Sequence, residues 1–255
     1  MTSAAPSPAA PADEDLLEKN RRFYDLLWSG ATLVEPQRFN TWPLVQSLLP
    51  SCPQRLEVAP GLRPRLPLAD TRFLDISAPA LAKLQGRGAQ VVQSQVSSLP
   101  FPAASFDLVC ALDIVEHVDD DEGVLAELAR VARGGATVLL STPLHQSMWT
   151  PFDDFVGHRR RYEPDELLAK LARHHLRVER SAVFGMQPRS SRLVDAGMWW
   201  LVHHRERAMW WYNRVFMRVA LWFQEELRFS PGLLPTAGVD EVFLVCRRGD
   251  WPAAH

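Results

Sequence analysis

Short apolar runs alternate with helical patterns from residue 55 onward. Amphipathic helices with acidic first turns are predicted over 119–135, which ends in Gly-Gly, and over 163–175. Strands that alternate with helices in units of about 30 residues form a parallel, doubly wound sheet. The predicted strands are 55–59, 72–76, 90–93, 106–111, 136–141, 176–185 and 239–248. The last of these follows a long excursion, so we expect it to close a seven-stranded, Rossmann-like α/β sheet in the antiparallel direction.

The segments outside this sheet differ in composition. Residues 1–12 are rich in Pro, Ala and Ser and are expected to be a disordered tail. Residues 13–50 should form an N-terminal helical cap, with helices over 13–28 and 38–49. The Rossmann-like core is expected over 51–190, a helical insertion over 191–235, and the final strand within 236–248.

The insertion, whose helical pattern runs from about 191 to 227, holds five of the nine tryptophans of the chain. They are Trp199, Trp200, Trp210, Trp211 and Trp222. Three uses compete: a lid or packed cap over the ligand edge, a homodimer interface, and a helix lying in a membrane surface. We favour the lid.

Bulk composition excludes several classes of protein. The net charge of −2 gives no positive field for nucleic acid. No apolar run of about 18 residues exists, so no transmembrane helix is predicted. The three cysteines form no paired or metal-binding spacing and suit free thiols in the reducing cytoplasm. No signal peptide is predicted either, and a cytoplasmic protein is expected.

Acidic residues close the first two predicted strands. Glu57 ends the first, and Asp75 ends the second 18 residues later. A dinucleotide fold places a ribose-binding acid about 20 residues after its first loop. The parallel sheet brings the ends of these strands to one edge, where ligands bind.

Together these acids and the segment "QVSSLPFPAASFDLVCALDIVEHV" resemble the class I S-adenosylmethionine-dependent methyltransferases, small-molecule branch, over about 53–186. The resemblance implies S-adenosylmethionine as cofactor and a role for each matching residue. Asp75 would bind the ribose, Ile76 would pack on the adenine, and Gln95 would accept the adenine amino group beside Val96. Ala111 and Leu112 would face the methionine part.

The glycine-rich loop of that family is altered here. Its pattern reads Glu57, Ala59, Gly61 and Arg63, with Pro60 between. Pro64 and Pro67 forbid the long helix that normally follows, because each removes a backbone donor. Glu57 contacts the cofactor or fixes the loop backbone, and both alternatives stay open. With the helix N-terminus lost, Arg63, or else Arg65, is expected to hold the methionine carboxylate, unless both are merely solvated.

Methyl transfer to a hydroxyl needs a group that takes its proton. His145 is the first candidate, followed by His117 and His158, because histidine titrates near neutral pH. Tyr24 and Trp28 of the N-terminal helix are expected to contact the acceptor. The further acceptor contacts that we predict are Trp149, Asp154 and Tyr162.

Two local patterns have alternative interpretations. Asp113, Glu116 and His117 stand at i, i+3 and i+4, so they could bind a divalent metal as some methyltransferases do; we predict no metal. The basic run 157–162 could bind phosphate, although ion pairs with Asp153, Asp154, Glu163 and Asp165 are favoured.

The expected function is therefore O-methylation of a small, largely apolar molecule in specialised metabolism, with histidine as general base. The alternatives are N- or C-methylation, metal-assisted O-methylation of a quinone precursor, and a methyltransferase fold that binds a ligand without turnover.

Overall fold

The computed structural model describes residues 21, 24, 25, 27–185, 211, 219, 221, 222 and 224–249. Its strands are β1 (Arg55–Val58), β2 (Thr71–Asp75), β3 (Gln90–Gln93), β4 (Phe106–Leu112), β5 (Ala132–Pro143), β6 (Leu176–Phe184), β7 (Ser230–Pro231) and β8 (Glu241–Arg248). Its α-helices are α2 (Trp42–Leu48), α3 (Ala78–Gln85), α4 (Asp121–Val131), α5 (Pro151–Val156) and α6 (Pro164–Arg173). Short 3₁₀ helices are η1 (Pro36–Arg38), η2 (Leu49–Ser51), η3 (Val115–His117) and η4 (Gln146–Met148).

One sheet contains all the described strands, in the order β3-β2-β1-β4-β5-β8-β6-β7. The first five strands are parallel, and β8 inserts antiparallel between β5 and β6. The predicted doubly wound sheet with antiparallel closure is confirmed. The count is eight rather than seven, because the two-residue β7 pairs with Arg180 and Ser181 at the edge of β6.

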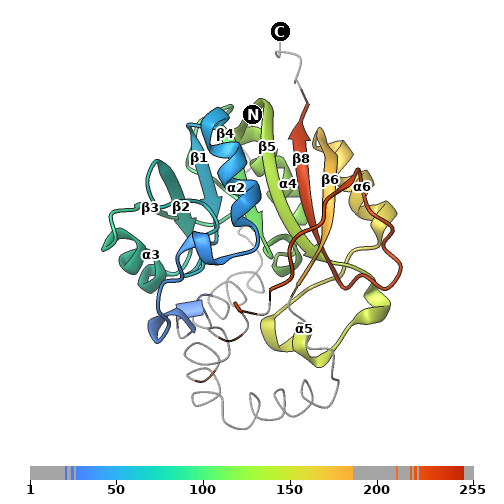
Figure 1. Cartoon of the computed structure of the whole chain (residues 1–255), viewed down its shortest axis with the longest axis horizontal. Coiled ribbons are helices and arrows are strands. Elements are labelled where there is room, and N and C mark those ends of the chain that lie inside the picture. Colours follow the sequence, from blue (N-terminus) through green and yellow to red (C-terminus); the bar gives the residue numbers. More distant parts are fainter. Residues whose placement is uncertain are drawn as a thin grey trace, which may run out of the picture.

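Helices cover both faces of the sheet (Figure 1). Leu44 and Val45 of α2 pack with Leu108 and Cys110 of β4 on one face. The alternate β4 residues pack with α4 and α6 on the other face, because successive side chains of a strand point to opposite sides. Burial of both faces explains why the strands read as continuous apolar runs.

Several predicted boundaries shift. The helix predicted to stop at Gly134–Gly135 ends at Val131, and β5 begins at the next residue. The helix predicted over 38–49 is α2 with a 3₁₀ turn on each side. Helix α5 was not predicted; Thr150 and Asp153 cap its first turn reciprocally.

The segments at the two ends of the core are described only in part. Residues 1–20 and nearly all of 191–220 lie outside the described residues, so the tail and most of the aromatic insertion stay predictions. Residues 24, 25 and 27–29 are helical, as expected for the end of the first helix, whereas 224–227 are not helical. In the described part of the chain, no helix is long and apolar enough to cross a membrane. All three cysteines are buried free thiols.

Candidate active site

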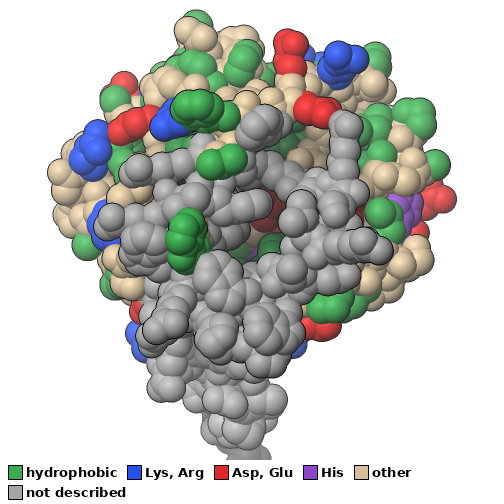
Figure 2. Space-filling model, turned by 60° about the horizontal axis from the view of Figure 1, so that its bottom comes forward, with side chains coloured by type: hydrophobic (Ala, Val, Ile, Leu, Met, Phe, Trp, Pro, Cys, Tyr) green, Lys and Arg blue, Asp and Glu red, His purple; other side chains and the backbone are tan. Residues whose placement is uncertain are grey.

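The carboxyl ends of the parallel strands meet at the lower edge of the sheet in Figure 1, where α5 also lies. Ligands of open α/β sheets bind at such an edge. Figure 2 turns this edge toward the reader, and acidic side chains are visible at the bottom of a hollow there. The predicted cofactor residues lie at the ends of β1, β2 and β4 or in the loops after β1, β2 and β3, so the fold gathers them at this edge.

Glu57 fixes the loop after β1. Its carboxylate accepts hydrogen bonds from the backbone N–H of Arg65, at 2.8 and 3.1 Å, and of Leu66, at 2.8 Å. Burial raises the pKa of Glu57 to about 7 even though these donors favour its charged form. The loop-fixing alternative for Glu57 is therefore supported, and a cofactor contact stays a prediction.

Residues 59–70 contain no helix, as the two prolines predicted. Ala59 and Gly61 take the left-handed backbone conformation, with φ of 52° and 54°. Gly61 pays no steric penalty for it, whereas Ala59 carries a Cβ atom in a conformation that favours glycine. The loop thus has left-handed backbone at two of the three glycine positions of the family pattern, although Ala59 and Arg63 replace two of those glycines.

Asp75 joins the loop after β1 to the end of β2. Its Oδ2 accepts from the N–H of Gly61 at 2.9 Å, and its Oδ1 accepts from the N–H of Ser77 at 2.8 Å. The side chain is buried, and burial raises its pKa. Half-buried Ile76 lies beside it, and the Ser94 N–H donates to the Asp75 carbonyl at 3.2 Å.

The other predicted cofactor residues lie along the same edge. Gln95 is exposed and Val96 half-buried in the loop after β3. Pro60 is buried in the first loop, and Ala111 and Leu112 end β4. An acid next to an apolar side chain and an exposed amide on the next loop fit a nucleoside cofactor.

The N-terminal helix covers this loop. A Cβ atom added to Gly61 would lie 2.1 Å from the Trp28 indole, so the two residues are in direct contact. Asp25 accepts a 2.8 Å hydrogen bond from the Ser77 hydroxyl. Tyr24 reaches further, with its hydroxyl 3.4 Å from Nδ1 of His117. These contacts place Tyr24 beside His117 and Trp28 over the loop after β1. That either residue contacts the acceptor stays a prediction.

Lys83 of α3 holds the end of that helix. Its ammonium donates to the carbonyls of Trp28, Ser29 and Ala31 at 2.7 to 2.8 Å. The last carbonyls of a helix have no partner within it, so a lysine can cap them. Lys83 thereby fixes where Trp28 lies over the loop.

The two loop arginines differ in surroundings. The Arg63 guanidinium lies 5.2 Å from the ring centroid of Trp28. The Arg65 guanidinium lies 3.7 Å from that of Phe39, and burial lowers its pKa while the charge of Asp113 opposes the shift. Both arrangements are cation–π contacts. Whether either arginine binds the methionine carboxylate stays a prediction.

Two of the three candidate histidines meet at the site. The rings of His117 and His158 are 4.7 Å apart, edge to face. His158 Nδ1 lies 2.8 Å from Oδ1 of Asp153, which is fully buried. Burial lowers the pKa of His117 to about 3, so its imidazole stays neutral at physiological pH.

Asp153 is held as a carboxylate. Arg161 donates to it through Nε at 2.8 Å and Nη2 at 3.0 Å, and Thr150 donates from its N–H and its hydroxyl. These bonds hold the pKa of Asp153 well below its usual range. The sequence predicted an ion pair between the basic run and Asp153. It did not predict that Asp153 orients His158.

The remaining predicted residues lie in other contacts. His145 Nε2 is 2.8 Å from the Thr236 carbonyl, and its Nδ1 is 3.5 Å from Glu163. The Trp149 indole N–H donates to Asp154 at 3.2 Å. Tyr162, predicted to touch the acceptor, is 1% exposed.

Tyr162 belongs to the core instead. Its hydroxyl bonds to Asp121 at 2.8 Å and to the Val115 carbonyl at 3.3 Å.

The basic run 157–162 forms ion pairs, as favoured from the sequence. Arg159 pairs with Asp119 and Arg160 with Asp121, so most of the partners differ from the acids that the sequence analysis named.

Only two of the three residues that the sequence offered as an alternative metal site, Glu116 and His117, belong to a cluster of possible ligands. Ligand atoms of Glu116, His117 and His158 lie within 4.8 Å of one another. Asp113 is exposed and bonds instead to the Ser141 hydroxyl. Sequence spacing found two of the three clustered residues. It missed His158, 41 residues later, which only the fold brings near.

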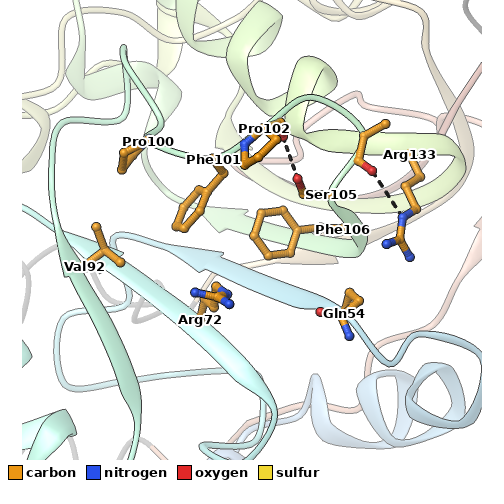
Figure 3. A pocket seen from close by; sticks show the side chains of 10 residues that line it. Gln54, Arg72, Val92, Pro100, Phe101, Pro102, Ser105, Phe106 and Arg133 are labelled. Atoms are coloured by element: carbon orange, nitrogen blue, oxygen red, sulfur yellow. Dashed lines mark hydrogen bonds between the residues drawn. The ribbon is translucent and has the colours of Figure 1, made fainter.

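A separate surface cavity lies at the opposite end of the sheet (Figure 3). It is lined by residues at the starts of strands, including Gln54, Arg72 and Phe106, and has a volume of about 520 Å³. Arg133 lines it too, and bonds to the Ala104 carbonyl and to Asp107. The cavity contains none of the predicted site residues.

Comparisons with known proteins find a methyltransferase match that extends from the end of β1 into β5. Residues 58–140 match the family "Methyltransferase domain". The chain is 33% identical over 104 residues to a protein of Mycobacterium tuberculosis named a probable S-adenosylmethionine-dependent methyltransferase. The aligned segment covers 38% of this chain and 37% of the relative. It is 32% identical over 83 residues to ajmaline N-methyltransferase of Rauvolfia serpentina, covering 29% and 28%.

Solved structures share the fold. A SAM-dependent methyltransferase of Thermotoga maritima superposes with a TM-score of 0.53 at 14% identity, over 93% of this chain and 95% of that one. The chain spans less than half the length of the curated relatives it matches. Residues 58–140 are therefore similar to a methyltransferase domain, and the relatives named S-adenosylmethionine-dependent support S-adenosylmethionine as the cofactor.

Proposed function

We propose that this chain transfers the methyl group of S-adenosylmethionine to an oxygen of a small, largely apolar molecule, with His158 accepting the proton. The observation that carries the proposal is the 2.8 Å contact between His158 Nδ1 and the buried Asp153 carboxylate. A carboxylate bonded to one ring nitrogen fixes the tautomer and leaves the other nitrogen as the base.

The second ring nitrogen of His158, Nε2, is the one that would take the proton. It lies 3.9 Å from Glu116 Oε1, and the ring faces His117. His117 follows β4, where the methionine part of the cofactor is expected. Because His117 stays neutral, it can accept a hydrogen bond from the acceptor hydroxyl without repelling the cofactor's positive sulfonium.

S-adenosylmethionine brings an electrophilic methyl group when it is bound. The residues of the chain bind the cofactor, orient the acceptor and exclude water. Asp75, Ile76 and Gln95 would hold the nucleoside, and Tyr24 with Trp28 would close the site from above. Closure excludes water from the reacting atoms and aligns the acceptor with the methyl group.

The test combines cofactor binding with turnover. Calorimetry with S-adenosylhomocysteine should show binding to the wild type and to His158→Gln. With a panel of hydroxylated aromatic acceptors, His158→Gln should lower kcat by about 10²- to 10⁴-fold, the usual contribution of a general base. His145→Gln is the matched control and should stay within a few-fold of the wild type. No S-adenosylhomocysteine binding, or an active His158→Gln, contradicts the proposal.

A second candidate is metal-assisted O-methylation of a quinone precursor. The cluster of Glu116, His117 and His158 favours it, because two imidazoles and a carboxylate suit a divalent cation. EDTA should then abolish turnover, and magnesium or zinc should restore it. Turnover that is indifferent to EDTA rejects this candidate and leaves the histidine base.

Other acceptor atoms are tested with the same assay. The Rauvolfia relative is named an N-methyltransferase, so amines belong in the panel. Binding of S-adenosylhomocysteine without turnover of any acceptor would favour a non-catalytic binding protein.

The setting that we propose is specialised metabolism in the cytoplasm. The aromatic insertion is proposed as a lid over the ligand edge, or as the interface of a homodimer.

A further inference from the structure

We propose that Glu127 and Arg130 of α4 are positioning residues for the cofactor, because they fix the loop that presents Gln95 to the adenine. The inference rests on the proposed function, in which Asp75, Ile76 and Gln95 hold the nucleoside. It adds two residues that belong to a different element and act on the cofactor only through that loop.

The segment between β3 and β4, residues 94–105, contains no helix and no strand. In the sheet order β3-β2-β1-β4, two strands separate its ends, so its course passes β2 and β1. Irregular backbone leaves N–H and C=O groups without the partners that a helix would supply. Side chains from other elements must therefore bind these groups if the segment is to keep one conformation.

The segment begins beside the predicted ribose-binding acid. The Ser94 N–H donates to the Asp75 carbonyl at 3.2 Å. A closed turn follows, in which the Ser98 N–H donates to the Gln95 carbonyl at 3.3 Å and the Ser94 hydroxyl donates to the Ser98 carbonyl at 3.1 Å. The position of Gln95 thus depends on how the chain is held on each side of this turn.

Glu127 and Arg130 bind three backbone groups directly after the turn. Glu127 Oε2 accepts from the Leu99 N–H at 2.7 Å. Arg130 donates to the Leu99 carbonyl at 2.9 Å and to the Phe101 carbonyl at 2.8 Å. The two side chains also bond to each other, with Arg130 Nε 2.6 Å from Oε1 and Nη2 2.9 Å from Oε2 of Glu127. Both backbone groups of Leu99 are therefore bound to α4.

Helical spacing makes this pair a rigid clamp. Glu127 and Arg130 stand at i and i+3, so they lie on the same face of α4. Leu125 and Leu128 of the same helix are buried in the core, which holds α4 against the sheet. The hydrogen bond from Arg130 lowers the pKa of Glu127, so this acid is charged at neutral pH.

The exposure of the pair argues against a role in stability alone. The Glu127 and Arg130 side chains are 21% and 36% exposed. An ion pair at such a surface contributes little by itself, because water screens it and two long side chains lose freedom. The planar guanidinium nevertheless presents a fork of donors that fits the acid and two carbonyls together. We therefore assign the function of the pair to the loop that it holds.

A second arginine holds the other end of the same segment. Arg133 donates to the Ala104 carbonyl at 3.2 Å and pairs with Asp107 at 2.6 Å. These contacts lie next to the start of β4 and not beside the turn that carries Gln95. Arg133 is therefore a control that matches Arg130 in residue type, in the kinds of partner and in the segment that it binds.

The experiment is a double-mutant cycle on the affinity for S-adenosylhomocysteine, measured by calorimetry. Gln95→Ala removes the adenine acceptor and Arg130→Met removes the clamp, and each should weaken binding by about tenfold. If Arg130 acts through Gln95, the double variant should bind little more weakly than Gln95→Ala alone. Independent effects would instead multiply to about a hundredfold. Arg133→Met should stay within a few-fold of the wild type.

A stability measurement separates positioning from a general loss of structure. Arg130→Met and Arg133→Met each lose an arginine that binds an acid and backbone carbonyl oxygen, so they should melt at similar temperatures. A lower affinity in Arg130→Met alone then has a cause other than lost stability. Arg130→Lys, which keeps the charge but not the fork, is the milder second variant and should show the same coupling to Gln95.

Four outcomes would overturn the inference. They are wild-type affinity in Arg130→Met, wild-type affinity in Gln95→Ala, losses that multiply in the double variant, and an equal loss in Arg133→Met. Each of them leaves the proposed function intact, because methyl transfer requires only that the cofactor binds. If the wild type does not bind S-adenosylhomocysteine, the proposed function and the inference both fail.

Discussion

Trp28 lies directly against Gly61, at a distance that leaves no room for a side chain at position 61. Residue 28 belongs to the N-terminal helix and residue 61 to the loop after β1, so this contact joins the cover of the site to its cofactor loop. The left-handed φ of Gly61, +54°, is a second requirement for glycine at this position.

Gly61→Ala should therefore lower the free energy of unfolding by about 3 kcal/mol, through backbone strain and through the clash with Trp28. Gly88→Ala is the matched control, because Gly88 has φ of +86° and open space around it. It should lose only about 1 kcal/mol. Chemical denaturation measures both, and equal losses would show that the clash is relieved without cost.

Glu57 should make stability depend on pH. Its pKa of about 7 in the folded state lies above the ordinary 4.5, so between these values the folded state binds more protons than the unfolded state. Stability contributed by Glu57 is complete at low pH and falls as pH rises toward 7, by at most about 3 kcal/mol. Denaturation at pH 5 and pH 7.5 should show a smaller decrease for Glu57→Gln than for the wild type. A parallel decrease in the two proteins would contradict this assignment.

Lys83→Met should loosen the N-terminal helix without unfolding the sheet. The substitution removes hydrogen bonds from an ammonium to three carbonyls, and we expect a loss of about 1 to 2 kcal/mol. Hydrogen exchange should become faster in residues 27–31 and stay unchanged in β4. Arg87→Met, which breaks an exposed pair with Glu35, is the control. Uniformly faster exchange would indicate global destabilisation instead.

Tyr162→Phe tests whether Tyr162 serves the core or the acceptor. Loss of its bond to Asp121 should reduce the free energy of unfolding by about 1 to 2 kcal/mol. The KM for an acceptor should stay the same, because the hydroxyl is buried among α4 residues and η3. An increase of KM by tenfold or more at unchanged stability would restore the predicted acceptor contact.

Measuring the affinity for the cofactor product distinguishes the roles of the two loop arginines, Arg63 and Arg65. If Arg63 holds the methionine carboxylate, Arg63→Ala should weaken S-adenosylhomocysteine binding by about tenfold or more in calorimetry, the size of one charge-assisted hydrogen bond. Arg65→Ala should mainly destabilise the loop, because Arg65 stacks on Phe39. Wild-type affinity in both variants would end the proposal that an arginine replaces the lost helix N-terminus.

Local patterns were sufficient for the sheet and for the edge at which its parallel strands end. Apolar runs located the strands because strands buried on both faces must be continuously apolar, and Pro64 and Pro67 excluded a helix before β2. Glu57 and Asp75 were found because each directly follows or ends such a run. Boundaries were less accurate where one element passes into the next without a loop, as at Val131, because no turn residue marks the change there.

The sequence by itself determined the fold class, the resemblance to methyltransferases and the acids at the strand ends, since these depend on short segments whose chemistry is local. Only the tertiary structure decided which distant side chains share the site. His158 joins His117 because the segment after α5 returns to the end of β4, where the Arg159 N–H donates to the Glu116 carbonyl at 2.7 Å. Such contacts depend on the packing of elements far apart in the chain, and no spacing along the sequence records them.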